Sequence, residues 1–571
     1  MDIKRGLLWF VFLFSLLTLW NNWNVYNGKA PLFGAAPPAG ANLPNAPGAA
    51  SASATAAAAS AASATAASAS AAGATADAFK PEDVTITTDV FKATFDTAGA
   101  KLKRLELLQY QETKAEWLGD VVMDKIHGTT DKAPPKNVLI FDNTPESTYL
   151  AETGLTDANQ PGIDSGYKVR PGARALDSGD TLQLVFDAEK NGVKLTKTFT
   201  FKRGQYAIDV KHDVTNNTAA AIAPTLDLRL VRDGTLPKNP RFAPNPYTGP
   251  AAYTDAEHFQ KQTFEQIKDG KDPLAKQSNN GWVAMVQHFF VSAYVPAANV
   301  PRENYTQKVG DNLYAVGSTL HFPSIAPNAS AALDITLYSG PQEMTALNQV
   351  SDTLYLTRDY GRTAIVAKPI FWIMDSLHSV IGNWGWTIIA FTILMKIVFF
   401  PLSAASFRSM AKTKQLQPKM QSIRERFKDD PQKMNQATME LYKTEKINPI
   451  GGCLPMVVQM PVFIALYYVL QLSIETRNAP WIGWVHDLST PDPYSILPIL
   501  MAGLSFLQMR LSPAPPDPTQ AKLMMFMPLM FSVMFFMFPS GVVLYYVVNT
   551  LLSIAQQQFV NKRLLANPKK S

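Results

Sequence analysis

The chain contains 571 residues, of which 47% are hydrophobic, and its 52 Lys and Arg exceed its 46 Asp and Glu. Large apolar residues are concentrated in residues 370–400, 449–472 and 494–560, whereas residues 80–345 are polar and mixed; this excludes an ordinary soluble protein and indicates a membrane protein that carries a soluble domain. The basic residues lie beside apolar segments, which excludes a nucleic-acid-binding patch, and the only cysteine, Cys453, excludes an internal disulfide.

Residues 1–26 predict an N-terminal transmembrane signal anchor. Lys4 and Arg5 precede a short apolar run, as in a signal peptide. A cleaved signal peptide is the alternative, but the residues after the run are large and polar, and Trp23 and Tyr26 suit a membrane interface. We therefore expect a retained anchor with its basic start in the cytoplasm.

The next two segments differ sharply in composition. Residues 27–79 are rich in Ala, Ser and Pro and have no apolar face to bury, so we interpret them as a flexible tether. Residues 80–345 contain short stretches in which apolar and polar residues alternate, such as Val-Lys-Leu-Thr-Lys-Thr-Phe-Thr-Phe at 193–201. Alternation with a period of two, interrupted by Gly, Pro, Asn and Asp, predicts an all-β sandwich domain.

The β-domain shows no pattern typical of a catalytic or metal site. Its histidines lack metal-ligand spacing, and no nucleophile motif accompanies them; they are His127, His212, His258, His288 and His321. We expect no metal, no cofactor and no enzymatic activity. A sugar-binding or enzymatic β-domain on a membrane anchor is an alternative that these scattered histidines disfavour.

Residues 346–378 connect the β-domain to the apolar half of the chain. Arg358, Arg362 and Lys368 give the segment a polar side, while residues 370–374 are apolar. We predict a helix that lies in the membrane interface, with a simple linker as the alternative.

Residues 386–401 have the length and apolar character of a membrane span, yet Lys396 lies inside it. A charged side chain near the middle of a bilayer costs about 2.5–3.5 kcal/mol on insertion scales, so such a residue usually has a function. The alternative is that Lys396, near the cytoplasmic end, extends its ammonium group into the lipid headgroups.

Residues 402–447 are strongly basic. Ten Lys and Arg face five Asp and Glu, which gives a net charge of +5. Apolar residues recur at helical spacing on both sides of Asp430 and Pro431, a pair typical of a helix start. The segment therefore predicts a helical hairpin, which its positive charge places in the cytoplasm.

The remaining spans alternate across the membrane. They are predicted at 449–472, 494–511, 523–538 and 542–560, followed by a basic tail at 561–571. The predicted protein is an all-α polytopic core of five helices at 379–560 plus the signal anchor, with both termini in the cytoplasm and the β-sandwich outside.

No Asp or Glu occurs within the five C-terminal spans. Pumps and proton-driven transporters usually need such carboxylates, and Lys396 has no anionic partner among the spans. Its candidate neighbours are neutral: Thr392, Gln459, Ser505, Gln508, Ser532, Asn549 and Gln556. A lone cation among hydroxyls and amides suits a water-filled groove whose anionic partner comes from another molecule.

The span at 523–538 is rich in methionine. Met527, Met530 and Met534 are among its residues, and methionine repacks readily around unlike apolar partners. We predict an adaptable apolar surface, with ordinary packing or lipid contact as the alternative.

Several strings in the apolar half occur in an order typical of one family. They are Leu-Gln-Pro-Lys at 416–419, Asn-Pro-Ile-Gly-Gly-Cys-Leu-Pro at 448–455, Gln-Met-Pro-Val-Phe at 459–463, Asp-Pro-Tyr-Ser-Ile-Leu-Pro at 492–498 and Pro-Ser-Gly-Val-Val-Leu-Tyr-Tyr at 539–546. Together the chain resembles the YidC/Oxa family of membrane protein insertases, in the Gram-negative form with a large periplasmic domain. The resemblance covers essentially the whole chain.

The resemblance implies a five-helix core around a hydrophilic groove that is open to the cytoplasm and to lipid. Lys396 matches the groove cation and Thr392 lies one turn earlier, while Tyr545 and Tyr546 join the methionines in an apolar surface where clients leave. Many relatives carry arginine at the position of Lys396, and lysine lacks the bidentate guanidinium fork.

The implied activity moves short polar client segments across the bacterial inner membrane without making or breaking a bond. The implied partners are nascent membrane proteins, the Sec translocon, and ribosomes or targeting factors. The basic residues Lys412, Lys419, Arg424 and Arg426 are candidate contacts for such cytoplasmic partners or for anionic lipid. A small-solute transporter or channel is the alternative, which the absence of intramembrane carboxylates and inverted repeats disfavours.

Overall fold

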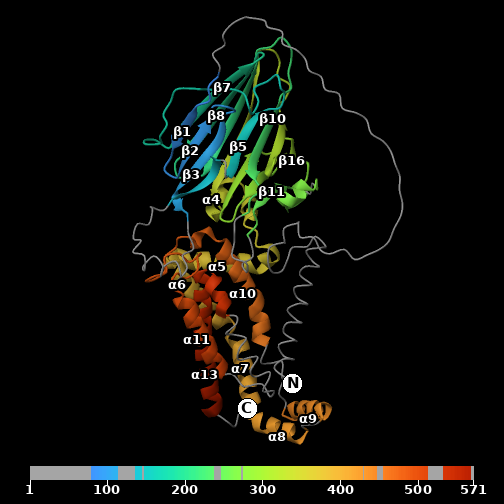
Figure 1. Cartoon of the computed structure of the whole chain (residues 1–571), viewed down its shortest axis with the longest axis vertical. Coiled ribbons are helices and arrows are strands. Elements are labelled where there is room, and N and C mark those ends of the chain that lie inside the picture. Colours follow the sequence, from blue (N-terminus) through green and yellow to red (C-terminus); the bar gives the residue numbers. More distant parts are fainter. Residues whose placement is uncertain are drawn as a thin grey trace, which may run out of the picture.

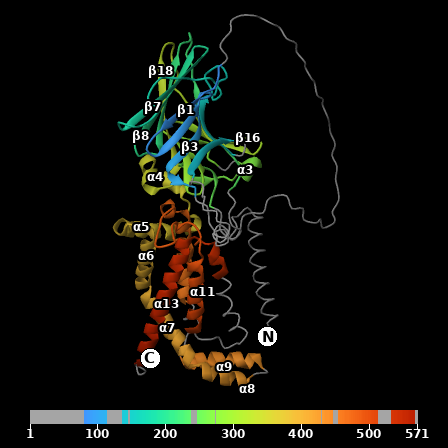
Figure 2. The same cartoon turned by 60° about the vertical axis from the view of Figure 1, so that its left-hand side comes forward.

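The computed structural model describes residues 79–112, 136–144, 147–236, 246–271, 274–427, 430–445, 454–511 and 532–566. The predicted signal anchor, almost all of the tether, Met527, Met530 and the end of the tail lie outside these residues. Figures 1 and 2 show the strands gathered at one end of the molecule and the long helices at the other, so the two halves predicted by composition are separate in space.

Two antiparallel sheets of nine strands each form the β-domain. In sheet order, the first contains β1 (Asp83–Thr87), β2 (Phe91–Asp96), β3 (Lys101–Gln111), β4 (Asn137–Thr144), β5 (Ser147–Leu155), β10 (Thr225–Asp233), β17 (Leu313–His321), β16 (Arg302–Gly310) and β13 (Gln277–Ser278). The second contains β12 (His258–Lys261), β11 (Gly249–Thr254), β14 (Trp282–Val286), β15 (Phe290–Pro296), β18 (Ser330–Pro341), β9 (Ala207–Asn216), β8 (Val193–Lys202), β7 (Thr181–Lys190) and β6 (Lys168–Val169).

The sandwich core follows directly from the alternating sequence. Along β8 every second side chain is buried, as the period of two predicts. Phe95 from the first sheet packs between Phe186, Phe199 and Phe201 from the second, with ring centroids 4.7–6.2 Å apart. Such interlocking aromatic rings bury a large apolar area, and the predicted all-β sandwich is confirmed.

The described chain also contains ten α-helices and four short 3₁₀ turns. The α-helices are α3 (Phe264–Lys268), α4 (Met344–Val350), α5 (Ala364–Ile381), α6 (Trp384–Val398), α7 (Phe400–Gln415), α8 (Gln417–Arg426), α9 (Pro431–Thr444), α10 (Leu454–Leu472), α11 (Ile496–Leu511) and α13 (Ser540–Ala566). Short 3₁₀ turns occur at η1 (Leu354–Thr357), η2 (Gly361–Thr363), η4 (Ile474–Thr476) and η5 (Phe535–Met537). The predicted helical class of the C-terminal half is confirmed.

Helix α5 lies across the ends of α6, α11 and α13 that face the β-domain (Figures 1 and 2). It ends at Gly382, whose φ of 73° lies in the left-handed region, and Asn383 caps α6 by accepting a hydrogen bond from the Trp386 amide. These two residues turn the chain sharply. Residues 351–363 form short turns rather than helix, and the placement of α5 in a membrane interface stays a prediction.

The predicted span 386–401 differs from the structure at its end. Helix α6 ends at Val398, and α7 begins at Phe400 with a bend of 66° between them. Pro401 falls in the first turn of α7, where its missing amide proton costs nothing, so it begins a helix instead of ending one.

The hairpin predicted at 402–447 is correspondingly shorter. Helix α7 packs against α13 and α10, and only α8 and α9 pack on each other as the two arms of a hairpin. Leu416 and Met420 form a small apolar cluster with Leu441 and Tyr442, and Asp430 caps α9 as its sequence predicts. The first third of the predicted hairpin thus belongs to the helical core.

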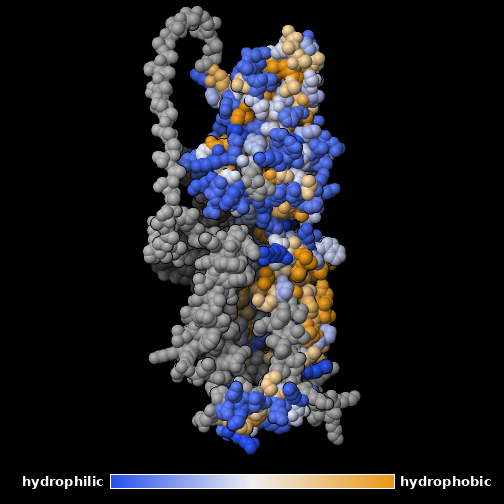
Figure 3. All heavy atoms as spheres, turned by 90° about the vertical axis from the view of Figure 1, so that its right-hand side faces the viewer, coloured by the Kyte–Doolittle hydropathy of each residue, from blue (hydrophilic) through white to orange (hydrophobic). Residues whose placement is uncertain are grey.

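By length and composition, one described segment, Gly361–Ile381, could cross a membrane, and α6 with α7 passes the same test only as a bent pair. The segments Gln459–Leu472 and Ile496–Leu511 are apolar but shorter. Where Figure 3 leaves the described helices visible, most of their side chains are apolar, and they lie between a mostly hydrophilic β-domain and a hydrophilic α8–α9 hairpin. The number of membrane passes stays a prediction.

Candidate functional site

Lys396 lies on α6 opposite α13. Its ammonium group donates a hydrogen bond of 2.6 Å to the Ser553 hydroxyl, which in turn donates to the Asn549 carbonyl at 2.7 Å. In the described part of the chain, no carboxylate forms an ion pair with this lysine. An ammonium group has three protons to donate, so one hydroxyl leaves capacity for further acceptors.

Thr392 does not extend this contact. It is only 1% exposed, and its hydroxyl donates a 2.6 Å hydrogen bond to the Ile388 carbonyl of its own helix. Such bonding within a helix satisfies the hydroxyl locally. The structure therefore brings Lys396 and Ser553 together. The Thr392 hydroxyl bonds to its own helix instead, so its predicted role in the groove stays a prediction.

Gln459 on α10 donates a hydrogen bond of 2.8 Å to the Tyr545 hydroxyl on α13. The sequence placed these residues in different groups, the groove and the apolar exit surface, and the structure makes them neighbours. Gln508 on α11 is half-buried, Ser532 before η5 is buried, and both have interaction partners. Tyr545 is itself buried, so a surface for clients would have to begin at its half-buried neighbour Tyr546.

A row of buried polar side chains runs along α13: Thr550, Ser553, Gln556 and Gln557. The spacing of three or four residues places them on one face of the helix. Thr550 contacts the Met501 sulfur at 3.8 Å, and Gln557 donates to the Leu511 carbonyl at 3.4 Å. The site predicted from the sequence lacks Thr550, Ser553 and Gln557, although this spacing inside an apolar segment was a usable signal.

Aromatic rings form a cluster beside the Gln459–Tyr545 contact. Tyr546 lies edge-on to Phe463 and Phe535, with centroids 4.7 and 4.8 Å away, and 5.6 Å from Tyr545. Met534 packs at the edge of the same apolar core. These rings join α10, η5 and α13 into one apolar wall next to the polar groups.

Residues 473–495 contact the end of the helices that faces the β-domain. The Ser540 hydroxyl donates to the Asp487 carbonyl at 2.8 Å, and the Gly541 amide donates to the Leu488 carbonyl at 3.0 Å. Gly385 approaches the Trp481 ring so closely that no side chain would fit there. The loop is thus held against the starts of both α6 and α13.

The four candidate contacts for cytoplasmic partners do not form one cluster. Lys412 lies on α7, whereas Lys419, Arg424 and Arg426 lie on α8. Lys419 forms an ion pair with Glu445 within the hairpin. Arg426 lies over the Phe427 ring with its guanidinium carbon 5.7 Å from the centroid. The hairpin thus uses part of the positive charge of α8 in contacts of its own.

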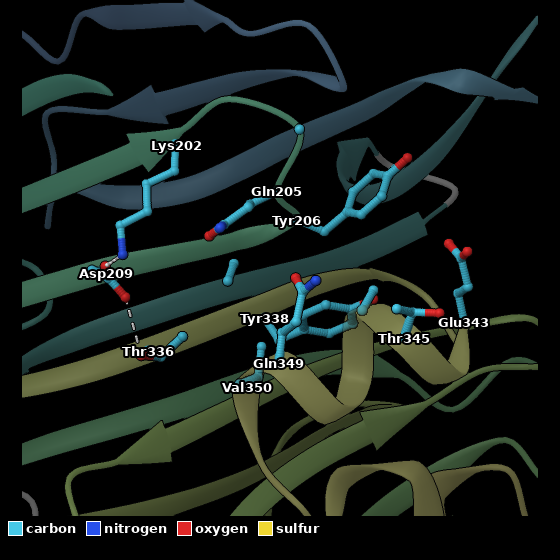
Figure 4. A pocket seen from close by; sticks show the side chains of 13 residues that line it. Lys202, Gln205, Tyr206, Asp209, Thr336, Tyr338, Glu343, Thr345, Gln349 and Val350 are labelled. Carbon is cyan, nitrogen blue, oxygen red and sulfur yellow. Dashed lines mark hydrogen bonds and ion pairs between the residues drawn. The ribbon is translucent and has the colours of Figure 1, made fainter. Parts of the chain in front are cut away.

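Two adjoining pockets of about 550 and 870 Å³ lie on the β-domain, and Asp209, Thr336 and Val350 line both of them. In Figure 4, the Lys202–Asp209 ion pair and its Thr336 contact lie at one end of the smaller pocket, and Tyr206 and Glu343 lie at the other. Neither lining contains histidine or cysteine, and no cluster of potential metal ligands occurs among the described residues.

Comparisons with known proteins cover both halves of the chain. Residues 83–373 match a family model described as "YidC periplasmic domain", and residues 376–567 match one described as "60Kd inner membrane protein". Two proteins named "Membrane protein insertase YidC" are similar over 99–100% of both chains, at 52% identity in Janthinobacterium sp. (strain Marseille) and 51% in Herminiimonas arsenicoxydans.

A solved structure titled "Active YidC insertase crystal structure with the first transmembrane domain resolved" also matches, at 19% identity. The match covers 83% of this chain and 91% of that one, with a TM-score of 0.38. The family of this chain is therefore assigned from the sequence matches alone.

Proposed function

The chain belongs to the YidC family of membrane protein insertases, and from that premise we propose that Lys396 and the polar face of α13 accept the polar segments of client proteins. As a member, it is a membrane protein insertase of the bacterial inner membrane with a periplasmic β-domain, and it is not an enzyme. Its partners are membrane proteins that it inserts.

The observation that carries the proposal is the incomplete pairing of Lys396. Its ammonium group has one hydroxyl partner, Ser553, among the described residues. Water can occupy its remaining donors at rest, and a carboxylate or carbonyl of a client can replace that water during insertion. A charge-assisted hydrogen bond of this kind is stronger than a neutral one, which lowers the cost of bringing an acidic segment into the bilayer.

The surroundings of Lys396 support a client path that opens only at the cytoplasmic end of the helices. Residues 473–495 hold the starts of α6 and α13 together at the β-domain end, so a client segment would enter from the opposite, cytoplasmic end. Gln459 and Tyr545 place a polar contact beside the rings of Phe463 and Tyr546. An apolar client segment would follow these rings into lipid, while its polar neighbour stays near Lys396.

We further propose the topology and cofactor-free mechanism that the sequence predicts. The chain crosses the membrane six times with both termini in the cytoplasm, and α5 lies in the outer interface. The proposed domains are the signal anchor at 1–26, the tether at 27–79, the β-domain at 80–345, the interfacial region at 346–378, the helical core at 379–560 and the basic tail at 561–571. Ribosomes, targeting factors or anionic lipid would contact the basic residues of α7 and α8, and the Sec translocon is a further proposed partner.

The test is the Lys396→Glu variant in proteoliposomes, with two clients that differ only in whether the translocated segment is acidic or neutral. Because the new carboxylate repels the acidic segment, we expect insertion of that client to fall by about tenfold more than insertion of the neutral one. Equal effects on both clients would contradict the proposal and favour a lysine that only reaches the headgroups.

Photocrosslinking of a stalled client tests the path itself. Probes placed at Met534 and Tyr546 should capture the client, and a probe at the half-exposed Lys202 of the β-domain serves as the control. Capture at the control position alone would contradict the proposed path.

A further inference from the structure

Three consecutive glutamines on α13 have three different environments. Gln556 and Gln557 are buried, with 9% and 3% of their surfaces exposed, whereas Gln558 is exposed. Because the three side chains are chemically identical, any difference between them in stability or function comes from their surroundings. The three residues follow Ser553, the partner of Lys396, by three, four and five positions.

Gln557 has a structural task. Its amide nitrogen donates to the Leu511 carbonyl at 3.4 Å, at the last residue of α11. The carbonyls at the end of a helix have no partner within it, so this contact satisfies one of them and ties α13 to α11.

Gln556 has no such task. Neither its amide nitrogen nor its amide oxygen has a hydrogen-bond partner among the described residues, although both atoms are buried. A buried amide without partners destabilises the fold, and an apolar side chain of similar size would pack at lower cost. Packing alone therefore does not explain a glutamine at this position.

The position of Gln556 adds a second observation. Gln556 lies three residues after Ser553 in the same helix, so the two side chains share one face of α13. This is the face that is turned towards Lys396. The Gln556 amide therefore lies less than one helical turn beyond Ser553. Both residues belong to the row of polar side chains on α13 that we propose the client contacts. A carboxamide offers both a donor and an acceptor, and it carries no charge.

We propose that Gln556 binds the peptide backbone of the client segment next to Lys396. Its donor and acceptor match the C=O and N–H groups of an extended chain, which need partners once they leave water. This inference rests on the proposed function and adds a second kind of recognition to it. Lys396 selects acidic side chains, whereas Gln556 binds any client segment irrespective of its side-chain charge.

The experiment replaces each glutamine by leucine in the full-length protein: Gln556→Leu, Gln557→Leu and Gln558→Leu. Two quantities are measured for each variant, the melting temperature in lipid nanodiscs and the insertion rates of the acidic and neutral clients in proteoliposomes. Gln558→Leu is the matched control, since it makes the same chemical change at an exposed position.

We expect Gln556→Leu to melt at or above the wild-type temperature, because it removes a buried unpaired amide, yet to insert both clients about threefold to tenfold more slowly. Gln557→Leu should melt at a lower temperature, and Gln558→Leu should match the wild type in both measurements. Wild-type insertion by Gln556→Leu, or a loss of insertion that follows a lowered melting temperature, would overturn the proposal.

Failure of this inference is distinguishable from failure of the proposed function. If Lys396→Glu discriminates between the two clients while Gln556→Leu inserts both at the wild-type rate, only the role of Gln556 is wrong. If neither variant affects either client, the client path beside Lys396 is wrong as well. A photocrosslinking probe at position 556 should capture the stalled client, and one at position 558 should not.

Discussion

Two lysines, one in each half of the molecule, are removed from water in different ways. Lys197 of the β-domain is completely buried, and its ammonium group donates to the Gly99 and Thr153 carbonyls at 2.7 and 2.5 Å and lies 4.3 Å from the centre of the Tyr167 ring. Lys396 of the helical half has only the Ser553 hydroxyl as a partner among the described residues.

Two other buried charges of the β-domain are also paired. Arg302 donates to four backbone carbonyls, and Glu152 accepts from Arg229 at 2.7 Å. Fully paired groups stabilise one arrangement of strands, since moving them would leave several atoms unsatisfied. A partly paired group such as Lys396 costs stability and remains available to a passing client, as expected of a functional site.

The largest expected effect is at the junction between the halves, where both terminal nitrogens of the Arg358 guanidinium are paired. Its guanidinium donates to Glu475 at 2.8 and 3.2 Å and to the Ser473 hydroxyl at 3.0 Å. The Arg358→Leu variant should lose about 3–5 kcal/mol of unfolding free energy, because Glu475 would remain partly buried without a partner. Denaturant unfolding in detergent measures this loss.

Arg362→Leu is the matched control, because Arg362 is exposed and only four residues away. It should change the unfolding free energy by less than about 0.5 kcal/mol. Equal unfolding curves for the two variants would mean that the paired arginine contributes no more to stability than a surface one.

The second test breaks the pairing inside the β-domain. Lys197→Met should reduce stability by about 1–3 kcal/mol, because the Gly99 and Thr153 carbonyls lose a donor. Hydrogen exchange of the β5 and β8 amides in the full-length chain measures the change. Lys211→Met is the control, since Lys211 is half exposed and pairs with Asp213 on the surface.

The same lysine gives the β-domain a pH dependence. Burial lowers the pKa of Lys197 from its ordinary 10.5 to about 7, so the folded state binds fewer protons than the unfolded state between these values. Stability should therefore increase as the pH rises from about 7 to about 9, and Lys197→Met should lack this increase. A variant with the same slope as the wild type would show that another group causes it.

The smallest expected effect is at Ser553. Ser553→Ala removes the only described partner of Lys396, so water or client must satisfy the ammonium group entirely. We expect insertion of the acidic client to change by about twofold to threefold, with little change in melting temperature, because the site is already incompletely paired. A large loss of stability would mean that the Lys396–Ser553 contact is structural, like that of Lys197.

Much of the fold could be predicted because it follows from local periodicity. Alternation along 193–201 predicted a strand with one buried face, and Asp430 with Pro431 predicted the start of α9. The end of the first core helix could not be predicted in the same way. Pro401 can end one helix or begin the next, and the packing of α7 against α13 favours the second outcome.

The candidate site was predicted in part. The sequence identified Lys396, Gln459 and Tyr545, but it did not pair them correctly. The hydrogen bond from Lys396 joins residues 157 positions apart, and that from Gln459 joins residues 86 apart. Contacts over such separations depend on how whole helices pack, which no local pattern encodes.

The sequence by itself determined that this chain has a β-half and an apolar helical half, and that its predicted C-terminal spans contain a lysine but no acid. These properties are sums over residue types and their spacing. The tertiary structure alone decided which polar groups would be satisfied. Gln556, Gln557 and Gln558 are chemically identical, and only the packing of α13 leaves the first buried without a partner, gives the second a carbonyl, and exposes the third to its surroundings.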